Sequence, residues 1–355
     1  MSDRSPKKPP ETQKDGTAGR SPILRMVRLG FPWHTEDPFL FAVHHLDHYP
    51  QGDAKMAPTA SLAGRRMGSD FSNLNGWSMY HGRRVPGFPQ HPHRGFETIS
   101  IMRRGYIDHA DSLGATARLG PGDVQWMTAG KGIVHAEMFP LLDQKNANTL
   151  ELFQLWINLP AKDKMVKPHF TMMWREQIPV KTFHDAAGRV TQVTLVAGQL
   201  GDVRAPKPPP HSWASQANSH VAIFNVRMSP NATWTLPAGP AGLNRNLYHY
   251  NDVPLGVSST SIPVGVAVKL RSDAPATLQA GPKGCDVLIM QGRPIGERVV
   301  QHGPFVMNTE QEIRQAFVDY RRTQFGGWPW PSDDPVHARD AGRFAKHADG
   351  KVEKA

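Results

Sequence analysis

The 355-residue chain contains 41 Lys and Arg and 31 Asp and Glu, which gives a formal net charge of +10, and 39% of its residues are hydrophobic. This composition is ordinary for a folded protein and excludes wholesale disorder, while the single cysteine, Cys285, excludes an intrachain disulfide and any Cys-rich metal site. No apolar run approaches the roughly 18 residues of a membrane-spanning helix.

The N-terminal segment, 1–24, is polar and rich in Pro, Lys and Thr, and we expect it to be a disordered basic tail. Residues 1–28 hold seven Lys and Arg against three Asp and Glu, and the remaining positive charge is spread along the chain without a basic block. We therefore expect no specific binding of nucleic acid and no association with a membrane. The segment also lacks the apolar run of a secretory signal, which favours a cytoplasmic protein.

The folded body is predicted to be all-β. The 32 Gly and 32 Pro separate short runs rich in Val, Ile, Thr and aromatic residues, such as FETISIMRRG, GIVHAEMF and RVTQVTLVAGQL. Short strands between regular turn signals are typical of a β-sandwich or a β-barrel. We expect a first domain at 25–200, a Pro-rich linker at 201–218, a second β-rich domain at 219–330 and a loose polar tail at 331–355.

One helix is predicted near the end of the second domain. Thr309 and Glu312 have the spacing of a capping box, which marks a helix N-terminus. The apolar stripe of this helix consists of Ile313, Ala316, Phe317 and Tyr320. Paired glycines at 326–327 are expected to end the helix, whose apolar face should pack on the β body.

Two tripeptides, His91-Pro92-His93 and His135-Ala136-Glu137, carry the clearest chemical signal. Side chains at positions i and i+2 of a strand leave the same face, so each tripeptide presents two metal-ligating groups together. If both strands face one barrel interior, three imidazole nitrogens and one carboxylate converge. Such a set suits iron, nickel, copper, manganese or zinc and leaves coordination positions open for Lewis-acid or oxygen chemistry.

Each tripeptide alone is a weak signal. H-x-H is common in proteins that bind no metal. H-x-E resembles part of a zinc deaminase signature, but that signature also needs a later P-C-x-x-C, and this chain has only one cysteine. The pairing of both tripeptides with strands and Gly-rich turns makes a metal site the better interpretation. In the second half, His211, His220, His249 and His302 are scattered, and we expect them to be surface or core residues.

Longer blocks around these tripeptides resemble a known family. GFPQHPHRGFETISIMRRG at 87–105 and GDVQWMTAGKGIVHAE at 122–137 resemble the two metal motifs of the cupin superfamily, with Gly130 where the second motif usually has Pro. Together with ELFQLWINLPAKDKM and ERVVQHGPFVMNTEQEIRQAF, they are similar to the pirin family over about 91–320. The resemblance implies two packed cupin (jelly-roll) β-barrels with a short C-terminal helix and one metal in the N-terminal barrel.

The resemblance also implies particular residues and a reaction. The pirin ligand pattern falls on His91, His93, His135 and Glu137, whereas Glu97, at the cupin carboxylate position, is interpreted as structural. We expect one divalent transition metal, iron(II) first, with nickel, copper, manganese or zinc left open. Similarity to quercetin 2,3-dioxygenase implies an oxidoreductase that acts on a small aromatic hydroxy-keto compound, such as a flavonol, and on O2. Glu137 is then the catalytic proton acceptor.

A different class of function stays open. Pirins also resemble redox-responsive regulators, akin to transcription cofactors, in which the oxidation state of the metal alters a surface that binds a protein partner. A third alternative, a purely structural metal, is less favoured because closed structural zinc sites commonly include Cys. The sequence does not identify the metal carried in the cell, the natural substrate, a protein partner or the oligomeric state.

Overall fold

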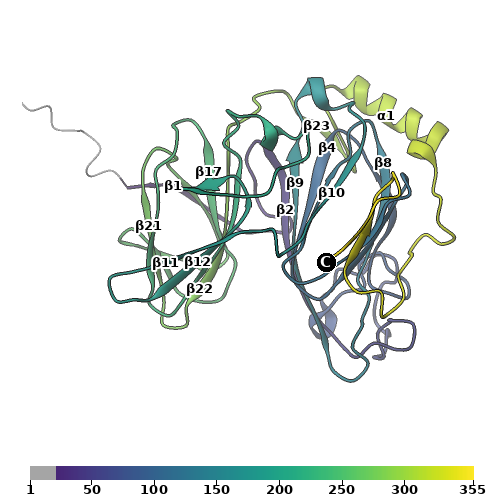
Figure 1. Cartoon of the computed structure of the whole chain (residues 1–355), viewed down its shortest axis with the longest axis horizontal. Helices are drawn as coiled ribbons and strands as arrows, with labels where there is room; N and C mark the ends of the chain where they lie inside the picture. Colours follow the sequence, from purple (N-terminus) through teal and green to yellow (C-terminus); the bar gives the residue numbers. More distant parts are fainter. Residues whose placement is uncertain (1–20) are drawn as a thin grey trace, which may run out of the picture.

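The structure is a computed structural model that describes residues 21–355, so most of the predicted tail at 1–24 lies outside the described residues. Two β-barrels lie side by side, and α1 (Glu310–Thr323), the single α-helix of residues 21–355, lies at one end of the N-terminal barrel (Figure 1). This confirms the predicted all-β architecture with two cupin barrels. No helix among the described residues is long and apolar enough to cross a membrane.

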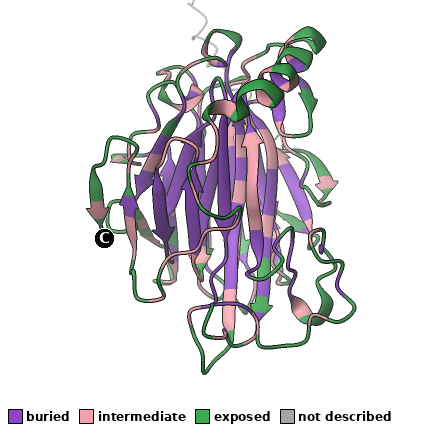
Figure 2. Cartoon of the chain, turned by 90° about the vertical axis from the view of Figure 1, so that its right-hand side faces the viewer, coloured by how far each residue is buried: buried purple, intermediate pink, exposed green. Residues whose placement is uncertain are grey.

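The N-terminal barrel is formed by a five-stranded and a six-stranded antiparallel sheet that face one another. In spatial order, the five-stranded sheet contains β10 (His169–Met173), β7 (Val124–Thr128), β4 (Phe96–Arg104), β9 (Asn148–Asn158) and β2 (Phe39–Tyr49). The six-stranded sheet contains β26 (Val352–Lys354), β25 (Phe344–Lys346), β6 (Thr116–Leu119), β5 (Ile107–Asp111), β8 (Ile133–Met138) and β3 (Gly87–His93). Most residues of the central strands are buried, as Figure 2 shows.

The C-terminal barrel pairs a seven-stranded with a four-stranded sheet. The seven-stranded sheet contains β1 (Ile23–Arg28), β20 (Val266–Leu270), β17 (Asn244–His249), β22 (Cys285–Gly292), β15 (Ala222–Met228), β12 (Val190–Ala197) and β11 (Val180–His184). The four-stranded sheet contains β16 (Thr233–Leu236), β21 (Ala276–Ala280), β18 (Leu255–Val257) and β19 (Thr260–Ile262). Cys285 is buried at the start of β22, as expected of a small apolar residue.

The two barrels pack through the outer faces of the five-stranded sheet of the first barrel and the seven-stranded sheet of the second. An apolar cluster between them includes Ile99 and Phe153 from the first barrel and Ile223 and Leu288 from the second. Strands of both sheets are therefore buried on two faces. Residues Phe96–Met102 of β4 are all buried although several are polar, and the run VLIM of β22 is continuously apolar.

Strand pairing corrects the predicted domain limits. β11 and β12, which fall inside the expected first domain of 25–200, pair within the sheet of the second barrel, and β1 pairs with β20 of that sheet. The predicted linker at 201–218 begins inside the short hairpin of β13 (Gln199–Leu200) and β14 (Val203–Arg204) and contains the 3-10 turn η3 (Trp213–Ser215). Other 3-10 turns are η1 (Leu74–Gly76), η2 (Ala161–Asp163) and η4 (Gln324–Gly326).

The prediction of a loose polar tail at 331–355 is wrong. β25 pairs with β6 and β26 pairs with β25, so this segment extends a sheet of the first barrel. Arg118 anchors the segment, because its guanidinium donates to the backbone oxygen of Ala338 and forms a buried ion pair with Asp108. A polar sequence can thus be ordered by pairing with a sheet edge rather than by an apolar core of its own.

The predicted helix is confirmed as α1. Thr309 caps its N-terminus in a capping box with Glu312, and Ile313 and Ala316 are buried on the stripe that faces the barrel. The hairpin β23 (Val300–His302) and β24 (Phe305–Met307) precedes it. Arg94 joins this region to the metal motif, because its guanidinium forms an ion pair with Asp319 at 2.8 Å.

Candidate metal centre

The two tripeptides lie on neighbouring antiparallel strands, β3 and β8, of the first barrel. His91 is directly opposite His135 in the register of these strands, and an irregularity in the pairing lies between Phe88 and His91. The alternation of side chains places His93 on the same face as His91. The sequence prediction that the histidines share one barrel interior is therefore confirmed.

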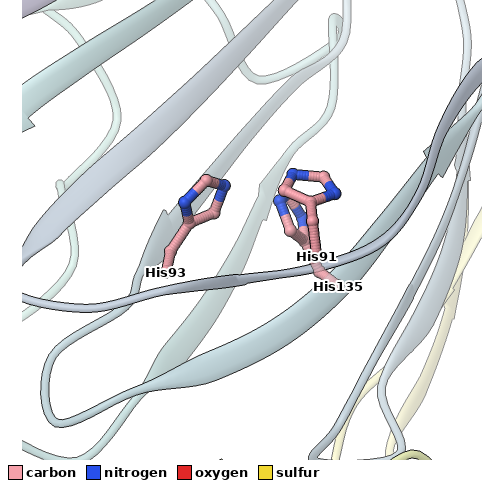
Figure 3. A group of neighbouring side chains, drawn as sticks. All are labelled: His91, His93 and His135. Carbon is pink, nitrogen blue, oxygen red and sulfur yellow. The ribbon is translucent and has the colours of Figure 1, made fainter. Parts of the chain in front are cut away.

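The three imidazoles form a compact group, which we call the His triad (His91, His93 and His135). One ligating nitrogen of each lies within 4.8 Å of the others, and the rings turn toward one another (Figure 3). The ring centroids of His91 and His135 are 4.4 Å apart, and those of His93 and His135 are 5.0 Å apart. Such an arrangement is close enough for one ion to contact all three rings.

Burial keeps the triad neutral, which is the form that binds a metal. Burial lowers the pKa of His91 to about 4 and holds the pKa values of His93 and His135 well below the usual range. The Nδ1–H of His91 donates to the backbone oxygen of Pro89 at 2.8 Å, which leaves Nε2 as the ligating atom. Both ring nitrogens of His135 are buried without a hydrogen-bond partner. A divalent cation would satisfy these nitrogens, so the triad fits a metal.

Glu137, the fourth predicted ligand, is beside the triad but is not part of the converging group. Its two carboxylate oxygens accept hydrogen bonds from the Ser100 hydroxyl at 2.7 Å and the Gln154 amide at 2.8 Å. Burial raises the pKa of Glu137, and its side chain lines the same cavity as His91 and His93. Ligation by Glu137 therefore stays a prediction, whereas its orientation by Ser100 and Gln154 is observed.

Three further polar residues near the triad, Ser100, His109 and Gln154, were not singled out from the sequence; Ser100 and His109 are buried and Gln154 is partly buried. Gln154 interrupts the apolar run 152–157 of β9, and this interruption is the signal that could have found it. His109 lies 5.6 Å from His135 between ring centroids, stacks on Phe170 and contacts Asp111 through Nε2 at 3.2 Å.

Glu97 lies away from the triad. The hydroxyls of Thr128 and Ser212 donate to its two oxygens, and Ser212 belongs to the linker. Burial raises the pKa of Glu97 to about 7, although both hydroxyl contacts lower it. Glu97 thus connects the linker to β4, in agreement with the structural role expected for it.

A cavity of about 720 Å³ opens on the triad. Aromatic rings form much of its wall, including Phe31, Phe41, Phe71, Phe88, Phe139 and Trp156. Polar groups are few, and among them are His91, His93, Glu137 and Gln154. An apolar cavity with a small number of convergent polar groups has the form of a small-molecule site.

The second barrel has no comparable group among the described residues. The Nδ1–H of His249 donates to the backbone oxygen of Pro263 at 3.0 Å, and the three other scattered histidines lie on the surface. The barrel interior is filled by apolar side chains such as Phe224, Trp234 and Leu247.

Comparison with known proteins agrees with this geometry. Residues 53–157 match the pirin family, and residues 223–326 match the pirin C-terminal cupin domain. Human Pirin is 34% identical over 252 residues, which cover 70% of this chain and 80% of the human protein. The chain belongs to the pirin family.

Other pirin relatives carry an enzymatic name. A Pseudomonas aeruginosa protein named "Putative quercetin 2,3-dioxygenase" is 37% identical over 249 residues, which cover 67% of this pirin and 79% of that protein. The crystal structure of quercetin 2,3-dioxygenase from Acinetobacter baumannii has the same fold, with a TM-score of 0.66 and 22% identity over 86% of this chain and 98% of that one.

Proposed function

We propose that this pirin is a metal-dependent dioxygenase that opens a flavonol or a related aromatic hydroxy-keto compound with O2. The observation that carries the proposal is the aromatic cavity that opens on the His triad. The name of the Pseudomonas relative supports the reaction class. Iron(II) is the metal we propose first, and the three imidazoles are equally compatible with nickel, copper, manganese or zinc.

The residues of this site have two proposed roles, which are binding and proton transfer. His91, His93 and His135 would hold the ion, and a bound ion supplies Lewis-acid activation of the substrate oxygens and a route for electrons to O2. Phe88 and Trp156 line the cavity and offer apolar surface to a planar substrate.

Glu137 is proposed as the group that takes the proton from the substrate hydroxyl. Its carboxylate faces the cavity, and Ser100 and Gln154 fix its position. A base must lie within hydrogen-bond reach of the proton that it abstracts, and a carboxylate held beside the metal ligands meets that requirement when the hydroxyl approaches the ion. Glu137→Gln retains the shape and loses the base.

The test is oxygen consumption by the iron-loaded protein with quercetin. We expect turnover well above that of free iron, and a decrease of about a hundredfold in kcat for Glu137→Gln. If no metal loading gives turnover above free metal, the enzyme proposal is wrong. The regulatory alternative then becomes the better account, and it predicts a protein partner whose binding differs between the ferrous and ferric protein.

A further inference from the structure

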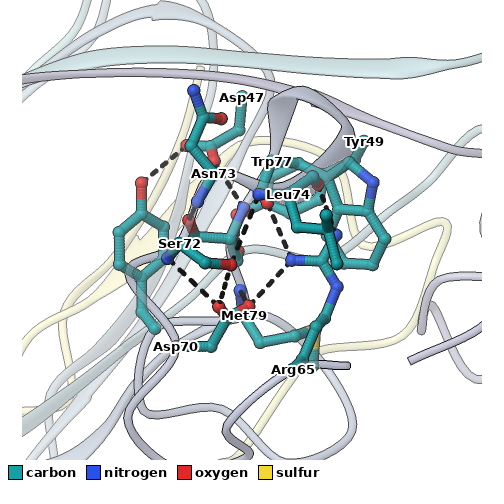
Figure 4. A network of polar contacts seen from close by, with 11 residues as sticks. Asp47, Tyr49, Arg65, Asp70, Ser72, Asn73, Leu74, Trp77 and Met79 are labelled. Carbon is teal, nitrogen blue, oxygen red and sulfur yellow. Dashed lines mark hydrogen bonds and ion pairs between the residues drawn. The ribbon is translucent and has the colours of Figure 1, made fainter. Parts of the chain in front are cut away.

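The mouth of the cavity is built by an irregular segment, 60–85, that a buried polar network holds in place. Arg65 and Asp70 form a buried ion pair at 2.8 Å, and the Arg65 guanidinium lies 3.4 Å above the Trp77 ring (Figure 4). Gly68 and Phe71 of this segment line the cavity. The network therefore holds in place a segment that lines the cavity.

A chain of three buried side chains runs from this network into the cavity. The Tyr80 hydroxyl donates to a carboxylate oxygen of Asp47 at 2.8 Å, and His45 Nδ1 lies 2.8 Å from the Tyr80 oxygen. The other Asp47 oxygen accepts from the backbone N–H of Ser78. Because the Tyr80 hydroxyl donates its proton to Asp47, the Tyr80 oxygen acts as the acceptor in its contact with His45. The proton of the His45 ring is therefore on Nδ1.

This chain leaves His45 Nε2 as a bare acceptor. Burial lowers the pKa of His45 to about 3, so the ring is neutral. His45 is only 5% exposed, it lines the cavity, and Nε2 has no hydrogen-bond partner among residues 21–355. Nε2 is thus available to accept a hydrogen bond from a donor group of a ligand in the cavity.

The backbone of Tyr80 indicates that this chain is held in place by its surroundings. Tyr80 has φ of 56°, in the left-handed region that side-chain-bearing residues seldom adopt. Two backbone hydrogen bonds between Tyr80 and Asp70 maintain this conformation. Strained positions that the surrounding structure enforces are common at ligand sites.

We propose that His45 Nε2 accepts a hydrogen bond from a phenolic hydroxyl at the end of the substrate remote from the metal. The inference rests on the proposed function and specifies its substrate as a polyphenol whose distal ring is hydroxylated. The Phe88 ring lies near both histidines, with its centroid 6.1 Å from that of His45 and 6.3 Å from that of His91. A flat aromatic substrate can therefore cover Phe88 while its two ends reach the triad and His45.

The experiment compares two flavonols that differ only in the distal ring. Quercetin carries hydroxyls there and galangin carries none, and their absorbance changes report binding to the metal-loaded full chain without O2. We expect wild type to bind quercetin about tenfold more tightly than galangin, as one hydrogen bond to a buried acceptor allows. His45→Phe should remove this preference and leave the affinity for galangin within about twofold.

Two more variants make the test decisive. Tyr80→Phe removes only the hydroxyl that fixes the His45 ring, and we expect it to reduce the preference even if His45→Phe does not fold. His48→Phe, on the exposed face of the same strand, should leave the preference intact. A wild type that binds both flavonols equally, or variants of His45 and Tyr80 that keep the preference, would overturn the assignment of His45. Failure of wild type to bind either flavonol would instead contradict the proposed function.

Discussion

The two barrels have the same architecture but differ in the side chains that fill their interiors. The first barrel encloses the His triad, Glu137 and a cavity of about 720 Å³. The second is filled by a continuous apolar cluster that includes Leu247 and Trp234. Close packing of apolar side chains stabilises a barrel, whereas unpartnered imidazoles and a cavity reduce its stability. The difference places the candidate metal site and its cavity in the first barrel, whereas the interior of the second is filled by apolar side chains.

The largest expected effect is the loss of metal from a triad variant. His135→Ala removes the only triad histidine with both nitrogens orphaned, and we expect metal content to fall from about one ion per chain to below about a tenth. The matched change in the second barrel, His249→Ala, should leave metal content unchanged. Metal analysis by mass spectrometry checks the metal content of both variants. Equal losses of metal would contradict the conclusion that the first barrel alone holds the ion.

Truncation of a core side chain in the second barrel should lower the stability of the protein without changing its metal content. Leu247 is fully buried among apolar neighbours, so Leu247→Ala should lower the free energy of unfolding by about 2–5 kcal/mol. Metal content of the folded protein should not change. Urea unfolding and metal analysis on the same preparation test this pair of outcomes, and loss of metal at unchanged stability would show that the second barrel is part of the site.

The buried carboxyl group of Glu97 on the first barrel should also make the stability of the protein depend on pH. Burial raises the pKa of Glu97 from 4.5 to about 7, so the folded state holds this proton more tightly than the unfolded state does. Stability from this group is present below about pH 4.5 and is lost as pH rises toward 7, by on the order of 2–3 kcal/mol. Glu97→Gln should remove that part of the pH dependence. An unchanged profile in urea unfolding between pH 4.5 and 8 would contradict the role given to Glu97.

The smallest effect concerns the orientation of Glu137. Gln154→Ala removes one of its two hydrogen-bond donors, and we expect metal affinity or kcat to fall by about 10- to 100-fold, as for other supporting residues of metal sites. Gln192→Ala, an exposed glutamine on β12 of the second barrel, is the matched control. A decrease of the same size in the control would show that Gln154 has no specific role in orienting Glu137.

The sequence predicted the features that depend on local spacing. The capping box of Thr309 and Glu312 fixes one helix terminus, and the i, i+2 alternation brings His91 and His93 to one face, so both could be read from neighbouring residues. The two-barrel fold came from the resemblance of longer blocks. Pairing between distant segments could not be predicted, because β1 meets β20 and β25 meets β6 only after the chain has folded.

The chain of His45, Tyr80 and Asp47 was missed for a related reason. Its members lie on a strand and on an irregular segment, and no periodic pattern connects the two. The left-handed conformation of Tyr80 is set by its bridge to Asp70 rather than by its residue type. Polar contacts in loops depend on the tertiary fold, and only the structure reveals them.

The central claim is that the His triad holds one ion. Anomalous diffraction at the iron edge, from crystals of the iron-loaded protein, tests it most directly. The account predicts a single peak at about 2.0–2.2 Å from a nitrogen of each triad imidazole, with no peak in the second barrel. A peak elsewhere, or an ion bound by fewer than three of these histidines, would contradict it.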